Sequence, residues 1–328
     1  MTGRQDVDMS DFRHRDARAE ASALLPGELV AAVLEPSPPA VNVDPWFADD
    51  PLGPARVDRQ IISPLRTGDV TWADVTGDDP SLALFARAHW LANHKPLASP
   101  PASYDATRRS LLALAFFVIS PARHQANGKI ALRWTKGGFG TPFFDDDRQV
   151  RVDGTHIVVQ HGEDVTVAPI TTLRAAGTFV GIQPGPPSGI DFHDMPDMPD
   201  LDEALEVDAA AVEFLDDWFG FATFVLHKLH FDAGSPPDTR VQIWSEHFDP
   251  AIELGDTDHG RRASFGASPG DAGIGVPYLY VAPWKPQEGD FWNAPFGGAA
   301  LTIDELRAAP DATRAAMDFF RRGRSRLS

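Results

Sequence analysis

The sequence contains no cysteine. Disulfide bonds, thiolate nucleophiles and cysteine-ligated metal sites are therefore excluded. Because nothing in the chain makes use of an oxidising compartment, we expect a cytoplasmic location. Long apolar runs are also missing: the longest, Leu111–Ile119, is far shorter than the roughly 18 residues of a membrane-spanning helix. The N-terminus has no basic head followed by an apolar segment, so we expect a soluble protein without a secretory signal.

Positive charge is scarce in this chain. It has 29 lysine and arginine residues against 47 aspartate and glutamate residues, which gives a formal net charge of −18 at pH 7. A surface this acidic repels phosphate groups, so we expect neither a nucleic acid nor an anionic membrane as partner. The basic cluster at 321–326 indicates favourable charge at the C-terminal end of a helix, with a nucleic-acid-binding arm as the weaker alternative.

Apolar residues are plentiful enough for a sizeable core, because they make up 43% of the 328 residues. Residues 1–44 are rich in Asp, Glu, Pro and Ala and predict a poorly ordered segment. We expect a first α+β lobe over residues 45–183 and a second over 208–328. An acidic, proline-rich linker over 184–207 is expected to join them.

Hydrophobic periodicity predicts the secondary structure of the first half. Helices are expected over Pro80–His94 and Tyr104–Ile119, and Ser120-Pro121 is expected to end the second one. Period-two patterns then predict strands, with a hairpin turn at Asp153-Gly154, and a helix follows. These ranges are 130–134, 141–144, 149–152, 157–160 and 165–170 for the strands and 171–180 for the helix.

The second half begins with Asp208–Phe231, whose apolar residues cover most of a helix circumference and predict a buried central helix. Strands are expected over 241–248, 251–254, 263–266 and 278–282, and helices over 301–309 and 313–322. The predicted class is α+β, with two antiparallel sheet meanders, each followed by a helix, around the central buried helix. The two halves share this layout as a loose internal repeat, although residue identity between them is negligible.

Gly266-Ala267-Ser268-Pro269-Gly270 matches the Gly-x-Ser-x-Gly pattern of serine hydrolases. In that motif the residue after serine donates its backbone N–H to the oxyanion. Here that residue is Pro269, which has no N–H. The segment therefore predicts a glycine-rich turn rather than a nucleophile.

Two other segments resemble ligand-binding loops. Gly137–Pro142 has the glycines of a phosphate loop, but Pro142 makes the required following helix unfavourable, so it predicts a bend between strands. A loop that lines a pocket is the alternative. Asp191–Asp200 repeats Met-Pro-Asp but lacks the spacing and central glycine of a calcium loop. We therefore expect no cofactor.

The segment Val241–Phe296 is dense in polar, aromatic and glycine residues, the mixture that builds concave sites. On a predicted strand, His247 and Asp249 point to one face and Glu246 to the other. Asp249 could orient His247 as a general base, with Glu246 as a further acid or base. The same residues could begin a metal site that His259, Asp256 or Asp258 completes, or simply satisfy partners at a strand end. We expect no bound metal.

Six further residues in this segment are candidate ligand-binding residues: Trp244, Arg261, Arg262, Tyr280, Trp292 and Asn293. The two arginines could clamp a carboxylate or phosphate, although pairing with the surplus acids of this chain is the more favoured interpretation. The aromatic residues could stack on a ring-shaped ligand or belong to the core.

Several motifs resemble segments of actinobacterial hypothetical proteins for which no activity is known. They are Asn127–Ile130, Gly138–Phe144, Ser245–Asp249, Gly266–Asp271 and Phe291–Gly297. The resemblance spans most of the chain after about Asp44 and implies a soluble bacterial protein. It implies no catalytic role for any residue.

Three functional hypotheses follow. The favoured one is a small-molecule-binding protein whose pocket lies where Trp244, Glu246, Tyr280 and Trp292 converge with the glycine loops. The alternative is a hydrolase or lyase that uses His247 with Asp249 or Glu246 as an acid–base pair. The third is an acidic protein-interaction module without a pocket. The sequence does not determine the oligomeric state.

Overall fold

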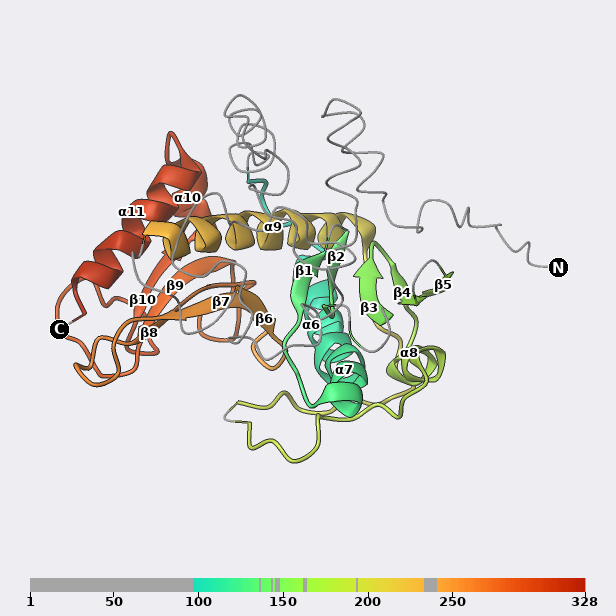
Figure 1. Cartoon of the computed structure of the whole chain (residues 1–328). Coiled ribbons are helices and arrows are strands. Elements are labelled where there is room, and N and C mark those ends of the chain that lie inside the picture. Colours follow the sequence, from blue (N-terminus) through green and yellow to red (C-terminus); the bar gives the residue numbers. More distant parts are fainter. Residues whose placement is uncertain are drawn as a thin grey trace, which may run out of the picture.

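A computed structural model of the chain describes residues 97–327, except 136, 143, 145–147, 162–163, 193 and 233–240 (Figure 1). The predicted N-terminal segment 1–44 and the predicted helix Pro80–His94 lie outside the described residues. None of the described helices is long and apolar enough to cross a lipid bilayer.

The strands form two antiparallel sheets of five, each a simple meander, and the predicted α+β class is confirmed. The first sheet has the order β1-β2-β3-β4-β5 and the second β10-β9-β8-β7-β6. The strands are β1 (Arg133–Thr135), β2 (Gly138–Gly140), β3 (Arg148–Asp153), β4 (His156–His161), β5 (Asp164–Pro169), β6 (Gln242–Trp244), β7 (Asp249–Leu254), β8 (Ala263–Ser268), β9 (Tyr278–Pro283) and β10 (Ala299–Thr302).

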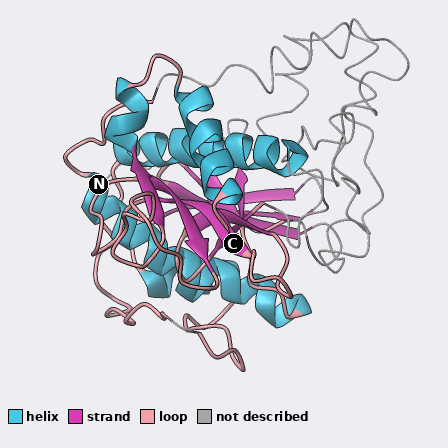
Figure 2. Cartoon of the chain, turned by 90° about the vertical axis from the view of Figure 1, so that its left-hand side faces the viewer, coloured by secondary structure: helices cyan, strands magenta, loops and turns pink. Residues whose placement is uncertain are grey.

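The two sheets meet at their β1 and β6 edges. Leu132 and Ile243 form an antiparallel bridge there, in which each backbone N–H donates to the other residue's carbonyl at 2.9 and 2.8 Å. Residues directly opposite each other point to the same face of a sheet, so one face of the first sheet continues into one face of the second. In side view the strands form a strongly twisted layer flanked by helices (Figure 2).

The first helical segment does not end at Ser120-Pro121 as predicted. It continues as α6 (Tyr104–Leu114), the π-helical turn η4 (Ala115–Ile119) and α7 (Ser120–Asn127). Pro121 lacks the N–H that would bind the Phe117 carbonyl, but that carbonyl accepts from Gly185 N–H at 3.0 Å instead. The wider π-turn and this outside donor together allow the proline inside the helix.

The central helix α9 (Ala209–Asp232) lies across both sheets, as the long gold helix in Figure 1 shows. It contacts β1 and β2 of the first sheet and β7 and β8 of the second. Trp218 and Phe219 are fully buried, which confirms the predicted central buried helix. The Trp134 indole Nε1 of β1 donates to Asp216 at 2.7 Å, and a Cβ at Gly220 would come within 3.2 Å of the same ring.

Three shorter helices complete the described part: α8 (Leu173–Val180), α10 (Ile303–Ala308) and α11 (Ala312–Ser325). Thr172 caps α8, and Gly181 ends it in the left-handed conformation. A capping box between Thr302 and Glu305 begins α10. Each half of the molecule thus has helix, five-stranded meander and helix in that order.

Strand positions differ from the prediction in both sheets. The glycine segment Gly137–Pro142, which was predicted to be a bend, contains strand β2. The described residues of the predicted strand 141–144 belong to no strand. A Cβ at Gly140 would lie 2.4 Å from Cβ of Arg151 on β3, so the close approach of these strands requires glycine. The predicted strand 241–248 is cut short by a turn at Ser245–Phe248, and β10 was not predicted.

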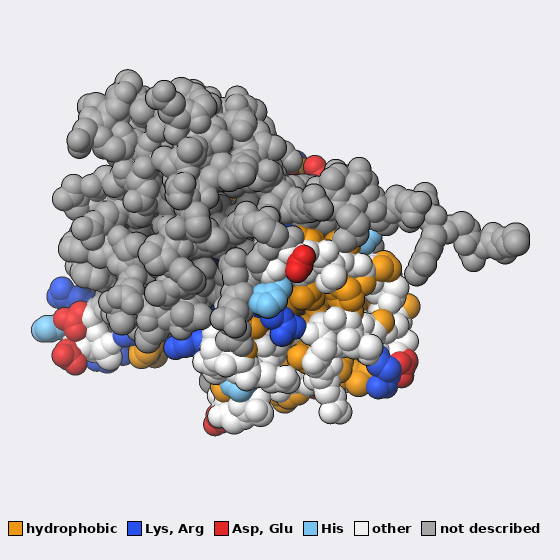
Figure 3. All heavy atoms as spheres, turned by 45° about the vertical axis from the view of Figure 1, so that its right-hand side comes forward, with side chains coloured by type: hydrophobic (Ala, Val, Ile, Leu, Met, Phe, Trp, Pro, Cys, Tyr) orange, Lys and Arg blue, Asp and Glu red, His pale blue; other side chains and the backbone are white. Residues whose placement is uncertain are grey.

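Charged groups are dispersed over the described surface that Figure 3 brings forward. There, hydrophobic and polar side chains are mixed, and acidic and basic groups stand in small separate clusters. No extended field of one charge gathers on the described part of this face. The described part of this face therefore offers no extended charged surface for recognition.

Candidate functional site

The alternation of side chains along the strands gives the second sheet two different faces. One face carries Ile243, Ile252, Phe265, Leu279 and Val281, all part of the main hydrophobic core. The other face is polar. Its residues are Gln242, Trp244, Asp249, Glu253, Ser264, Ser268, Tyr278 and Tyr280, with the small residues Ala251, Gly266 and Ala300 between them. Gln242, Asp249, Ser268 and Tyr278 are buried, yet none of them belongs to the core cluster.

Asp249 is the most unusual group on the polar face. Its side chain begins β7, and the residue is only 5% exposed. The Tyr280 hydroxyl donates to Oδ2, whereas Oδ1 is buried and has no partner among the described residues. Oε1 of Gln242, on the neighbouring strand and the same face, is likewise buried without a partner. Buried acceptors without donors are rare in proteins and require an explanation.

Burial raises the pKa of Asp249 to about 6, because removal from water penalises the charged carboxylate. The positive charge of His247 and the Tyr280 hydrogen bond oppose this shift, while the neighbouring Glu246 adds to it. Burial also raises the pKa of the Tyr280 hydroxyl well above its usual value, and the nearby Asp249 charge adds to that effect. Tyr280 therefore stays protonated and remains the donor of the pair.

Tyr280 reaches Asp249 because a glycine lies between them. Gly266 on β8 pairs with Tyr280 on one side and with Ala251 on the other. A Cβ at Gly266 would stand 2.4 Å from both Cζ and the hydroxyl oxygen of Tyr280. The tyrosine ring therefore lies directly on the backbone of β8, and its hydroxyl extends over that strand to β7.

We predict that Gly266→Ala separates Tyr280 from Asp249. The new methyl group would overlap the Tyr280 ring too closely for a small adjustment to relieve. The ring must therefore turn away, which leaves both oxygens of the Asp249 carboxylate without a donor among the described residues. We expect a loss of about 2 to 4 kcal/mol in the free energy of unfolding, measured by chemical denaturation. Gly275→Ala is the matched control, because a Cβ there meets nothing within 4 Å and Gly275 has no positive φ. Equal stability of the two variants would contradict the prediction.

Aromatic rings border the Asp249–Tyr280 pair. Phe296 is 45% exposed, stacks on Tyr278 with ring centroids 6.3 Å apart and meets the edge of Tyr280 at 6.2 Å. The Tyr278 hydroxyl donates to Asp271, whose other oxygen accepts from the backbone N–H groups of Gly273 and Ile274 at 2.7 and 2.8 Å. The glycine-rich turn after β8 thus fixes Tyr278, and the three rings form an aromatic wall that reaches the surface.

Four residues of the predicted acid–base and aromatic site lie near one another: Trp244, Glu246, His247 and Asp249. Trp244 pairs with Asp249 in the β6–β7 register and shares its face. Glu246 and His247 lie in the intervening turn rather than on a strand, so the predicted alternation of their side chains is wrong. His247 is exposed, and Ser245 donates to Glu246 at 3.3 Å. The turn ends at buried Phe248, which is alone among the described non-glycine residues in having a left-handed φ, +57°.

The other predicted ligand-binding residues lie elsewhere. Arg262 donates through Nε to Glu253 at 3.0 Å and stacks over the Trp284 ring at 4.3 Å. Arg261 lies in the exposed β7–β8 turn. Trp292 packs edge-on against Phe291, which in turn meets Phe319 of α11. Asn293 exchanges two hydrogen bonds with the backbone of Ala300, which orders the start of β10.

Sequence reasoning did not single out Gln242, Asp271 or the role of Gly266. The period-two pattern from Gln242 to Trp244 and from Asp249 to Glu253 places these polar residues on one face, and it could have indicated a polar sheet face. The contact between Tyr280 and Asp249 joins residues 31 positions apart, and only the three-strand register brings them together.

Comparison with known proteins adds no relative. No family model matches the chain, and neither a curated protein nor a solved structure matches it. Within the described residues, no group of three or more His, Asp or Glu side chains gathers closely enough to hold a metal ion.

Proposed function

We propose that the protein binds a small organic cation, an amine with an apolar body, on the polar face of the second sheet. The observation that carries this proposal is Oδ1 of Asp249, a buried carboxylate oxygen that accepts from no donor among the described residues. An ammonium group supplies up to three N–H donors and a positive charge, the two things that this oxygen lacks. Because a charged pair in a poorly solvated site is strongly favoured, the bound amine would hold Asp249 ionised.

The groups around Asp249 favour a cation over an anion. Gln242 offers a second unpartnered acceptor oxygen, and Glu246 contributes further negative charge. His247 is the opposing charge, but it is exposed to solvent. The rings of Tyr278, Tyr280 and Phe296 supply the aromatic surface that commonly accompanies carboxylates in amine recognition.

Binding of 2-phenylethylamine, followed by isothermal titration calorimetry at pH 7.5, tests the proposal. We expect Asp249→Asn to weaken the binding by about 10- to 100-fold, because it removes the charge that pairs with the ammonium group. Asp318→Asn, a change to an exposed carboxylate on α11, is the matched control and is expected to leave the affinity unchanged. The neutral analogue 2-phenylethanol and the acid 3-phenylpropionate are expected to bind much more weakly than the amine.

The affinity for the amine is also expected to depend on pH. The pKa of Asp249 is raised to about 6, so the carboxylate accepts a proton as the pH falls below that value. Each further unit of pH below about 6 is then expected to weaken binding about tenfold. An amine affinity that is the same at pH 5 and pH 7.5, or one that survives Asp249→Asn, would rule out Asp249 as the cation ligand.

A second candidate function is acid–base catalysis by Asp249. A carboxyl group with a pKa of about 6 can both donate and accept a proton near neutral pH, the property required of a general acid or base. This candidate keeps the hydrolase or lyase hypothesis but transfers the central role from exposed His247 to buried Asp249. A hydrolase or lyase rate that depends on the ionisation of one group near pH 6, and that is lost in Asp249→Asn, would favour this second candidate function.

A further inference from the structure

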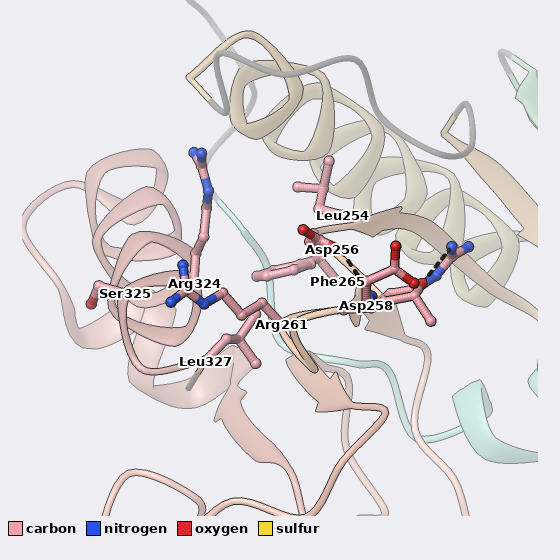
Figure 4. A pocket seen from close by; sticks show the side chains of 11 residues that line it. Leu254, Asp256, Asp258, Arg261, Phe265, Arg324, Ser325 and Leu327 are labelled. Atoms are coloured by element: carbon pink, nitrogen blue, oxygen red, sulfur yellow. Dashed lines mark hydrogen bonds between the residues drawn. The ribbon is translucent and has the colours of Figure 1, made fainter.

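A groove with a volume of about 980 Å³ lies apart from the Asp249 site, between the β7–β8 turn and the C-terminal end of α11. Leu254 and Phe265 line it from the strands, and Arg324 and Leu327 line it from the end of the chain (Figure 4). The turn contributes Asp256, Asp258 and the two adjacent arginines Arg261 and Arg262. A volume of this size suits a small organic ligand.

The groove has an apolar floor. Leu254, Phe265 and Leu327 are at most 9% exposed, and Phe265 packs against Phe320 of α11 with ring centroids 6.0 Å apart. These contacts hold the floor in place whether or not the groove is filled. An apolar ligand body resting on this floor would remove its own hydrocarbon surface from water.

Two arginines give the groove its positive charge. Arg261 extends from the turn toward the end of α11, where Arg324 lies (Figure 4). Arg261 forms no side-chain hydrogen bond or ion pair with any described residue and is exposed. Arg262 is committed instead to Glu253 and to the ring of Trp284, so Arg261 is the guanidinium that the turn offers to a ligand.

Asp256, an acidic residue of the turn, forms no ion pair with Arg261. The Asp256 carboxylate accepts from the His259 ring and from the backbone N–H of Asp258 at 2.8 Å, and it forms no ion pair with either groove arginine. The His259 hydrogen bond lowers the pKa of Asp256, so this carboxylate stays ionised and keeps the turn closed. Its bonds are therefore internal to the turn, and Arg261 keeps a guanidinium that it can offer to a ligand.

From this arrangement we infer that the groove is a second binding site, which takes a small organic carboxylate with an apolar tail. Arg261 and Arg324 bind the carboxylate, and the tail lies on Phe265 and Leu327. Guanidinium groups suit this role because their planar N–H donors match the two carboxylate oxygens. The inference does not depend on the amine site.

Calorimetric titration of the full chain with 4-phenylbutyrate tests the inference. We expect saturable binding that weakens about tenfold or more in Arg261→Ala and in Arg324→Ala, because each loses one charge-assisted pair. Arg321→Ala is the matched control: this arginine lies one turn earlier on α11, pairs with Asp318 and does not line the groove. Its affinity is expected to equal that of the parent protein.

Two further measurements separate this site from the alternatives. The neutral amide 4-phenylbutanamide is expected to bind at least tenfold more weakly than the acid, and Arg261→Glu is expected to abolish binding of the acid while leaving the thermal unfolding curve nearly unchanged. Asp249→Asn is expected to leave the affinity for 4-phenylbutyrate unaltered. Equal affinities for acid and amide, or full affinity in both Arg261→Glu and Arg324→Ala, would overturn the inference.

Discussion

The Asp249→Asn variant is expected to be more stable than the parent protein at pH 7.5, by roughly 2 to 3 kcal/mol in the free energy of unfolding. The folded protein raises the pKa of Asp249 to about 6, whereas an aspartate in an unfolded chain titrates near about 3.9. The folded state therefore binds the proton more tightly. Its ionised carboxylate is buried with one oxygen unpartnered, which costs stability above pH 6.

Because the pKa of Asp249 is raised on folding, the stability difference between variant and parent depends on pH in a defined direction. A carboxyl group whose folded pKa is raised contributes its full stability below about pH 4, and this contribution is lost as the pH rises through about 6. Asparagine keeps an acceptor for the Tyr280 hydroxyl and carries no charge. The difference in stability between variant and parent is thus expected to grow from pH 4 to pH 6 and then to remain constant.

Chemical denaturation at several pH values from 4 to 8 measures this difference, and the comparison of two proteins cancels the titration of the other acids. Asp318→Asn provides the control, since an exposed carboxylate is expected to change stability by less than about 0.5 kcal/mol. A variant that is less stable than the parent at pH 7.5 would mean that the charged carboxylate has a favourable structural partner. An increase in stability would support a functional reason for keeping the aspartate.

Removal of the Phe248 ring is expected to cause the largest loss of stability. The side chain is 1% exposed and meets the edges of Phe139 at 4.8 Å and Phe219 at 5.2 Å. It thereby ties the β6–β7 turn to β2 of the first sheet and to α9. We expect Phe248→Ala to lower the free energy of unfolding by about 3 to 5 kcal/mol, in line with buried aromatic truncations.

The backbone conformation at position 248 favours glycine over alanine. Phe248 has a φ of +57°, which alanine tolerates poorly and glycine adopts freely. We expect Phe248→Gly to be more stable than Phe248→Ala by about 1 kcal/mol, the reverse of the usual order at buried sites. Phe296→Ala, at an exposed ring, is the control and is expected to cost less than about 1 kcal/mol. Glycine less stable than alanine at position 248 would show that the left-handed turn is not retained.

Long periodic segments allowed much of the fold to be predicted. Helix α9 has an apolar surface nearly all round, and the β3–β4 hairpin has period-two strands on either side of Asp153-Gly154, so local sequence alone determined both. Helix α7 and strand β2 could not be predicted in this way. A distant N–H from Gly185 stabilises the first around Pro121, and the second needs the close approach of Arg151.

The candidate site was predictable only in part. Asp249, Tyr280 and Trp244 were identified from residue type, and they do share one face of the second sheet. Trp292 and Asn293 stood out for the same reason, but one packs beside α11 and the other orders β10. Residue type shows which side chains can take part in chemistry. The strand register, which depends on long-range pairing, decides which of them meet.

The bridge between Leu132 and Ile243 has a mechanical consequence. A single residue pair, Leu132 with Ile243, joins the two sheets at the β1 and β6 edges, whereas six residue pairs join β3 to β4. The junction between the two sheets is therefore narrow, and α9, which packs against strands of both sheets, helps to hold them together. Under a stretching load the two halves would begin to part at this line, one strand away from Asp249.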